Sequence, residues 1–550
     1  MISGGGSRRT RWKGCGCNYR YYSLSARANA RDLTIGLASA RTFVRSVAGW
    51  ADQDDDRSII RSPNSAVEKP INADILEIVK AEMDVGTNKK AFQINLDAKR
   101  YGTFAEVGAG QEVARRFFHV GGASGTIAKT MSAYDMTFSD AIYGPTDRYV
   151  SRVRLGTMLD HEYKLLIERL DQTLGAQRLF FVFADTVAAR SFKQHNEAHG
   201  WLGVRCQTDF RGESSQIIIH VRMLDEANVD QQEALGVIGV NLIYGAFYHA
   251  KVEELISSLQ ENLAPGRIEV DMIKFSGPAF AQVDNRLMSL QLVSQGLTDA
   301  VMFRADGETV QPAEVFYKKA ILVERGSFRP VTYATNDMLD GARRKFLHES
   351  GCDDSEVLVL MEMTLENLLA EGQLNHADFL ARVDILGALG RTVLISKFGE
   401  YYRLSGYLAR YTSKLVGLVM GVPSLMEIFD EKYYLNLEGG ILEALGRMFK
   451  GALKLYVYPM IDESSGKILT ASQIEVAPNL KALFQFIMDN NFIVEITDYH
   501  PEYLKIFPPD ALAKLQTGDS SWEKMVPPEV AQIIKQRGFF GYRQSSAAAA

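Results

Sequence analysis

Residues 320–339 of this 550-residue chain read AILVERGSFRPVTYATNDML. The run 320–324 is apolar enough for a buried strand, Gly326 marks a turn, and a helical pattern begins near Asn336. Nucleotide-binding α/β domains use such a strand–turn–helix unit to present backbone N–H groups and a helix N-terminus to a phosphate. The stretch therefore predicts a phosphate-binding turn inside an α/β domain.

The sequence around this unit alternates regularly between short apolar runs and longer helical patterns. The strand-like runs cover 320–324, 356–361, 392–396, 415–421, 453–458 and 492–496. Strands separated by single helices are joined by right-handed crossovers, which place them parallel in one sheet. We therefore expect residues 315–545 to form a mainly parallel, doubly wound, Rossmann-like α/β domain.

The preceding part of the chain is less regular. A strand, a tight glycine turn and a helix are predicted over 101–113, and the polar segment 209–213 between two strand patterns is a hairpin signal. A hairpin brings antiparallel pairing into the sheet. We expect residues 75–310 to form a separate, mixed α/β domain.

The first fifty residues contain nine Arg and Lys side chains and one acid, Asp32. A basic, Ser-rich, acid-poor leader is typical of an organelle transit peptide. The run 20–23 (RYYS) is similar to a mitochondrial processing pattern with cleavage before Ser23. We expect a transit peptide and linker over 1–70 and a mitochondrial location, with the plastid as the alternative.

Bulk composition limits the classes of partner that the protein can bind. Of the residues, 46% are hydrophobic, which is typical of a globular protein. The formal net charge is -6, which gives no overall basic field to attract nucleic acid. Apolar runs stay below the roughly 18 residues needed to span a bilayer. We expect a soluble protein whose partner is a small-molecule nucleotide, without a membrane span, and a homo-oligomer is compatible with the sequence.

A second glycine-rich stretch, 106–130, is a further candidate for anion binding. Glu106-Val107-Gly108-Ala109-Gly110 resembles the first motif of Rossmann-like methyltransferases, which implies S-adenosylmethionine as an alternative ligand. The other alternative is that these glycines only shape turns between packed elements. The candidate anion-site residues are Gly108, Gly110, Gly121, Gly122, Ser124, Gly125 and Lys129.

His195 and His199 have the i, i+4 spacing of a helical metal site. A metallohydrolase helix would have Glu directly after the first histidine, where Asn196 stands, and the sequence suggests no third ligand nearby. We predict a polar helix end before Gly200 and no metal site.

The segment 326–332 (GSFRPVT) resembles the first motif of nicotinate/nicotinamide mononucleotide adenylyltransferases, Gly-x-Phe-x-Pro-x-(His or Thr)-x-Gly-His. Ala334 and Thr335 stand where that motif has its final Gly and His. More broadly, residues 90–545 look like a family of soluble proteins of unassigned activity that are sometimes labelled nicotinate-nucleotide adenylyltransferase. Its recognisable runs here are 104–115 (FAEVGAGQEVAR), 132–136 (SAYDM) and 326–332.

The resemblance implies adenylyl transfer from ATP, with Mg²⁺, to a nicotinate or nicotinamide mononucleotide. It implies that the turn donates backbone N–H groups to the phosphates, that Thr332 bonds a phosphate oxygen, and that cations neutralise the pyrophosphate. A loose likeness of 395–403 to the second motif of the same enzymes adds Ser396 and Arg403. The implied catalytic residues are Thr332 and Arg403, and the implied phosphate-binding residues are Gly326, Ser327, Phe328, Arg329, Ser396 and Lys397.

The sequence thus favours a nucleotide-binding α/β protein, with adenylyl transfer as its most specific activity. Thr335 replaces the final histidine of the motif, whose imidazole stabilises charge on the transferred phosphate. This replacement leaves a rival hypothesis for the function open. The rival is a non-catalytic nucleotide-sensing or scaffold protein of an organelle.

Overall fold

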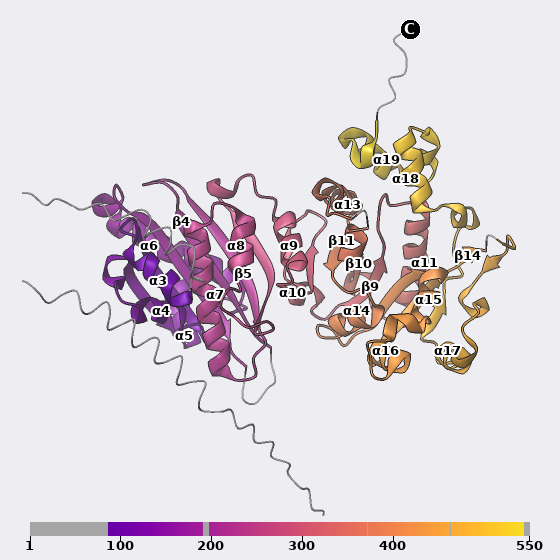
Figure 1. The fold of residues 1–550 in the computed structure, drawn as a ribbon, viewed down its shortest axis with the longest axis horizontal. Helices are drawn as coiled ribbons and strands as arrows, with labels where there is room; N and C mark the ends of the chain where they lie inside the picture. The colour runs from indigo at the N-terminus through magenta and orange to yellow at the C-terminus, as the bar shows by residue number, and fades with distance from the viewer. Residues whose placement is uncertain (1–85, 191–196, 371, 463, 544–550) are drawn as a thin grey trace, which may run out of the picture. The chain divides into compact units, whose positions relative to one another are not determined.

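The structure is a computed structural model that describes residues 86–190, 197–370, 372–462 and 464–543 (Figure 1). The leader and linker predicted over 1–70 lie outside these ranges. The described chain contains two large sheets, both within the compact unit Met83–Ala550. The predicted fold class, a mixed α/β part followed by a mainly parallel, Rossmann-like part, is confirmed.

The first sheet has six strands in the order β2-β1-β3-β4-β5-β6. β1 pairs in parallel with β2 and β3, and the remaining pairs are antiparallel. The predicted hairpin is confirmed as the β4–β5 pair. The strands are β1 (Arg100–Gly108), β2 (Ile127–Ala133), β3 (Leu179–Ala188), β4 (Ala198–Gln207), β5 (Ser214–Met223) and β6 (Ile268–Ser276).

Helices cover both faces of this sheet, because the strands carry apolar side chains on both of its faces. Phe104 and Phe183 belong to the core shared with α3, α4, α7 and α8, whereas Phe180 packs with Leu155 and Leu159 of α6 on the other face. The helices are α3 (Thr87–Leu96), α4 (Val113–His119), α5 (Met136–Tyr143), α6 (Arg152–Leu174), α7 (Asn228–Tyr248), α8 (Val252–Ser258) and α9 (Asn285–Ser294).

The second sheet has eight strands in the order β16-β13-β12-β9-β10-β11-β7-β8. β7 and β8 form an antiparallel addition at the β11 edge, and the other six strands are parallel. The strands are β7 (Ala300–Phe303), β8 (Thr309–Val310), β9 (Ala320–Arg325), β10 (Val357–Thr364), β11 (Thr392–Ser396), β12 (Val416–Gly421), β13 (Leu453–Tyr458) and β16 (Ile493–Glu495). A small separate ribbon pairs β14 (Met460–Ile461) with β15 (Ile468–Leu469).

Numbered along the chain from β9, the six parallel strands follow the order 3-2-1-4-5-6. This is the doubly wound Rossmann order, in which the chain turns back between its first and fourth strands. Here that switch point lies between β9 and β12, and β9 is the strand that begins the segment 320–339. Ligands of such sheets bind outside the carboxyl ends of the strands at this point.

Two apolar cores, one on each face, hold the second sheet. Leu322 and Met361 pack with α11, α13 and the C-terminal helices, whereas Ile321 and Leu360 pack with α14 to α17. The helices are α10 (Pro312–Phe316), α11 (Tyr333–Ser350), α12 (Leu365–Leu368), α13 (His376–Ala388), α14 (Tyr401–Leu408), α15 (Val422–Ile428), α16 (Gly440–Met448), α17 (Lys481–Asp489), α18 (Pro508–Thr517) and α19 (Pro528–Arg537). Among the described helices, none combines the length and the apolar character needed to cross a membrane.

Candidate functional site

A cavity of about 790 Å³ lies at the carboxyl ends of β9, β10, β11 and β12. We call it the switch-point cavity. Its walls come from the loops and helix starts that follow these four strands, so it occupies the place where a Rossmann-like sheet holds its ligand. The polar residues that line it are Arg325, Thr364, Glu366, Asn367, Lys397, Glu400, Tyr401, Arg403, Ser424, Glu427, Tyr433 and Tyr434, beside Gly326.

The turn after β9 opens into this cavity at Gly326. The N–H of Gly326 donates to the carbonyl of Glu362 at 3.0 Å, but the next two N–H groups, of Ser327 and Phe328, have no acceptor in the described chain. Phe328 has φ of 49°, a left-handed conformation that a non-glycine residue adopts only where the surrounding structure imposes it. Two adjacent unpaired donors in a strained turn are suited to an anion.

Arg325, at the end of β9, is held by a buried carboxylate. Its Nε and Nη2 donate to Glu362 at 2.8 and 3.0 Å, and its guanidinium carbon lies 4.3 Å from the centre of the Tyr401 ring. Burial alone would lower the pKa of Arg325, but Glu362 raises it above its ordinary value. Ser396 is fully buried and donates to Glu362 at 2.6 Å. Ser396 was predicted to bind phosphate, but its hydroxyl already donates its hydrogen bond to Glu362.

Lys397 and Arg403 line the switch-point cavity, and their charged groups remain accessible to solvent. Lys397 pairs with Asp299 at 2.8 Å and Arg403 with Glu400 at 3.6 Å, and the side chains are 41% and 54% exposed. Exposed ion pairs of this kind cost little to rearrange. The structure therefore brings three predicted residues, Gly326, Lys397 and Arg403, to one cavity.

Thr332, predicted as catalytic, is the N-cap of α11. It forms a capping box with Thr335, with each side chain bonding the other's backbone N–H at 3.3 Å. Both threonines are buried, and the neighbouring N–H of Tyr333 donates to Met525 of the C-terminal segment. The hydroxyl of Thr332 therefore stabilises a helix end and does not line the switch-point cavity.

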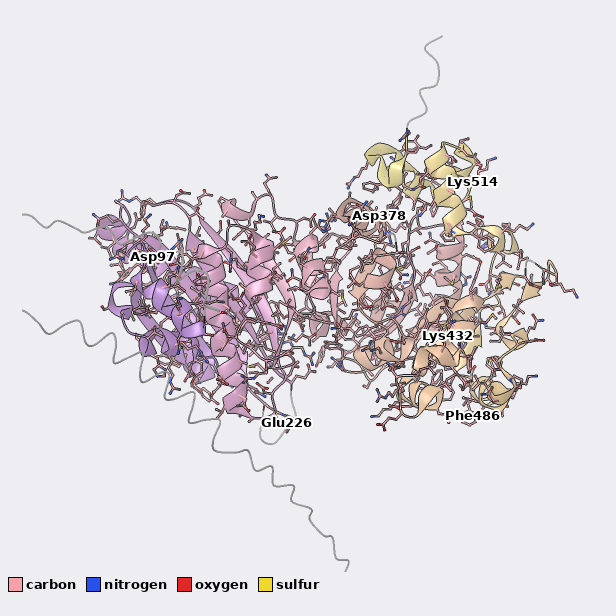
Figure 2. All side chains as sticks on the ribbon, viewed as in Figure 1. Asp97, Glu226, Asp378, Lys432, Phe486 and Lys514 are labelled. Atoms are coloured by element: carbon pink, nitrogen blue, oxygen red, sulfur yellow. The ribbon has the colours of Figure 1, made fainter. Side chains whose placement is uncertain are left out.

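Arg329 and Ser327 face α13. Arg329 Nε donates to Asp378, labelled in Figure 2, at 2.6 Å, and Arg382 donates to the carbonyl of Ser327 at 3.1 Å. Asp378 also pairs with Arg382. These contacts fix the outer side of the turn, so its shape is set before any ligand arrives.

The seven residues of the second anion-site candidate are divided. Gly108 is the last residue of β1 and Gly110 follows it, whereas Gly121, Gly122, Ser124 and Gly125 precede the amino end of the parallel strand β2, on the opposite edge. Lys129, in β2, pairs with Glu162 of α6. Positive φ angles at Gly108, Gly121 and Gly122 show that these glycines shape turns.

Sequence reasoning missed a pair of buried carboxyl groups. Glu106 of β1 and Asp185 of β3 are register partners, and Glu106 Oε1 accepts the N–H of Val113 at 2.8 Å. Burial raises the pKa of Glu106 to about 7, and burial together with Glu106 raises that of Asp185 well above its ordinary value. The only sequence signal for this buried pair was Asp185, an acid directly after the apolar run 179–184.

The predicted helix end at His199 is wrong, because His199 lies in β4, and His195 lies outside the described residues. His199 Nδ1 is 3.1 Å from His220 Nε2, and His220 Nδ1 is 2.5 Å from Asp271 Oδ1. Burial, then His220, lowers the pKa of His199 to about 4. Across the described ranges, no group of three or more His, Cys, Asp or Glu side chains is placed to hold a metal ion.

No family model and no curated protein matches the chain. Solved structures show only a weak and partial likeness to it. The competence/damage-inducible protein CihA from Agrobacterium tumefaciens is 16% identical, covering 28% of this chain and 93% of its own, with a TM-score of 0.22. A competence-damaged protein (CinA) superfamily member from Enterobacter cloacae is 12% identical, covering 34% and 98%, with a TM-score of 0.23. Likeness this low assigns neither activity nor ligand.

Proposed function

We propose that this chain is a nucleotide-binding protein whose ligand lies in the switch-point cavity, with its phosphates against the turn 326–328. One observation carries the proposal: a cavity of about 790 Å³ sits where the strand order reverses, and the turn after the first parallel strand opens into it. That volume is in the usual range for small-molecule sites.

The polar groups around the cavity match the parts of a nucleotide. Lys397 and Arg403, which line the cavity, suit phosphate oxygens, and the unpaired N–H groups of Ser327 and Phe328 come directly after Gly326, where the turn opens into it. Glu366 follows β10 and can accept a hydrogen bond from a ribose hydroxyl. Tyr433, which is exposed at the wall, offers an aromatic surface to the base.

Adenylyl transfer is the narrower form of this proposal. In that reaction a phosphate oxygen of the mononucleotide would attack the α-phosphorus of Mg²⁺-ATP, and pyrophosphate would leave with its charge neutralised by Lys397 and Arg403. The buried Thr332–Thr335 capping box offers no imidazole or free hydroxyl to that centre. This favours the alternative, binding without efficient turnover.

Calorimetry with ATP, NAD, nicotinamide mononucleotide and S-adenosylmethionine tests the proposal on the full chain. A Cβ at Gly326 would lie 3.0 Å from the Phe328 ring, so Gly326→Val should disturb the turn and weaken nucleotide binding at least tenfold, about 1.4 kcal/mol. The matched control is Gly156→Val on α6, where an added Cβ meets no atom within 4 Å.

Four outcomes separate the proposed functions. Failure of every nucleotide to bind the unaltered protein would end the proposal, as would equal binding by Gly326→Val. Pyrophosphate release from ATP with the mononucleotide would establish the transferase form. Binding of S-adenosylmethionine that depends on Gly108 or Gly110 would support the methyltransferase alternative instead.

A further inference from the structure

A second cavity, of about 1140 Å³, meets the first at Lys397 and Arg403, which line both. It runs along α14 and the turn 409–415 to the end of α16, and these two helices pack side by side (Figure 1). We call it the basic groove. Its charged lining consists of one acid, Asp299, and six cations, Lys397, Arg403, Arg410, Lys414, Arg447 and Lys450.

Four of these cations have carboxylate partners. Lys397 pairs with Asp299, Arg403 with Glu400, Lys414 with Glu356, and Arg447 with Glu443. Arg410 and Lys450 have no ion-pair partner anywhere in the described chain, and the guanidinium carbon of Arg410 lies 5.8 Å from the centre of the Tyr407 ring. After pairing, two full positive charges from different elements remain facing one groove.

Uncharged donors lie beside these two cations. The hydroxyl of Ser413 and the N–H of Gly451 make no hydrogen bond to the residues that the structure describes, and both line the groove. Gly406 and Gly451 leave open space where a side chain would stand. The groove thus combines unmatched charge, free donors and room for a ligand.

We propose that the basic groove binds a small oligophosphate, a compound that carries two or more adjacent phosphate groups, with Arg410 and Lys450 as its main contacts. Two unmatched cations suit a multiply charged anion better than a single orthophosphate. A nucleic-acid strand would need exposed aromatic rings for stacking, whereas the groove's Tyr402 and Tyr407 are buried.

Calorimetry with inorganic tripolyphosphate tests this on the full chain. The double variant Arg410→Ala/Lys450→Ala should bind it at least tenfold more weakly, because each lost charge-assisted contact contributes to affinity. The control, Lys99→Ala/Lys251→Ala, removes two exposed lysines that line neither cavity and should bind normally. Raising the salt from about 50 to about 200 mM should weaken binding to the unaltered protein.

A second variant protects the test from a folding artefact. Gly406→Glu places a carboxylate in the groove from a position where an added Cβ meets no atom within 4 Å, so the urea midpoint should hold while tripolyphosphate binding falls at least tenfold. The proposal fails if the groove variants bind normally, or if orthophosphate binds as tightly as tripolyphosphate. It also fails if only Gly326→Val removes binding, since the ligand would then occupy the switch-point cavity, or if the groove variants lose single-stranded RNA instead.

Discussion

The Glu106→Gln substitution should remove the part of the pH dependence of stability that Glu106 contributes between about pH 4.5 and 7. The pKa of Glu106 is raised from 4.5 to about 7 in the folded chain, first by burial. Between these pH values the folded protein holds a proton that the unfolded chain releases. The contribution of Glu106 to the free energy of unfolding is therefore greatest below pH 4.5 and falls as the pH rises through 7.

The size of the loss follows from the difference between the two pKa values. Between the two pKa values, each rise of one pH unit lowers the contribution of Glu106 to the free energy of unfolding by about 1.4 kcal/mol. Glu106 therefore accounts for about 3 kcal/mol over the whole window. Glutamine keeps an oxygen that can accept the N–H of Val113 but has no proton to lose. The variant should match the unaltered protein near pH 4.5 and exceed its stability by about 2–3 kcal/mol near pH 7.5.

Urea unfolding at a series of pH values measures this difference. Trp201 is buried in the same sheet as Glu106 and reports its unfolding, and a background in which the other three tryptophans, Trp12, Trp50 and Trp522, are replaced by Phe removes their signals. Glu168→Gln, on the exposed face of α6, is the matched control and should leave the pH dependence unchanged. An unchanged slope in Glu106→Gln, or a variant less stable than the parent at pH 7.5, would refute the reasoning. The N–H groups of α4 would then hold Glu106 ionised.

Three further outcomes are expected. An added Cβ at Gly110 would lie 1.9 Å from Asp185 Oδ1, so Gly110→Ala should cost about 1–3 kcal/mol in urea unfolding, and Asp185→Ser in the same chain should recover part of it. Thr332→Val should lower stability by about 1 kcal/mol through the lost cap while calorimetry shows unchanged nucleotide affinity; a selective loss of ATP binding would support the transferase form instead. We propose that mitochondria remove the basic leader, so N-terminal sequencing of protein isolated from mitochondria should start at or slightly beyond Ser23, and an intact Met1 would argue against a cleaved leader.

Local pattern was sufficient for the elements of the second sheet. Every parallel strand predicted between 320 and 496 is present, because apolar runs and intervening helices are encoded by neighbouring residues. Where the pattern was short, local reasoning failed. We predicted a polar helix end before Gly200, but the pairing of β4 with β3 and β5 places His199 in a strand. Strand pairing depends on residues far away in sequence.

The sequence by itself determined the α/β class, the parallel sheet and the strand–turn–helix unit at 320–339, since these follow from periodicity and chain handedness. Only the tertiary structure decided what the side chains do. It set the strand order that places Lys397 and Arg403 beside Gly326, and it turned Thr332 into a helix cap. It also buried Glu106 against Asp185, which is 79 residues away. Contacts between distant segments are fixed by packing, and no local pattern records them.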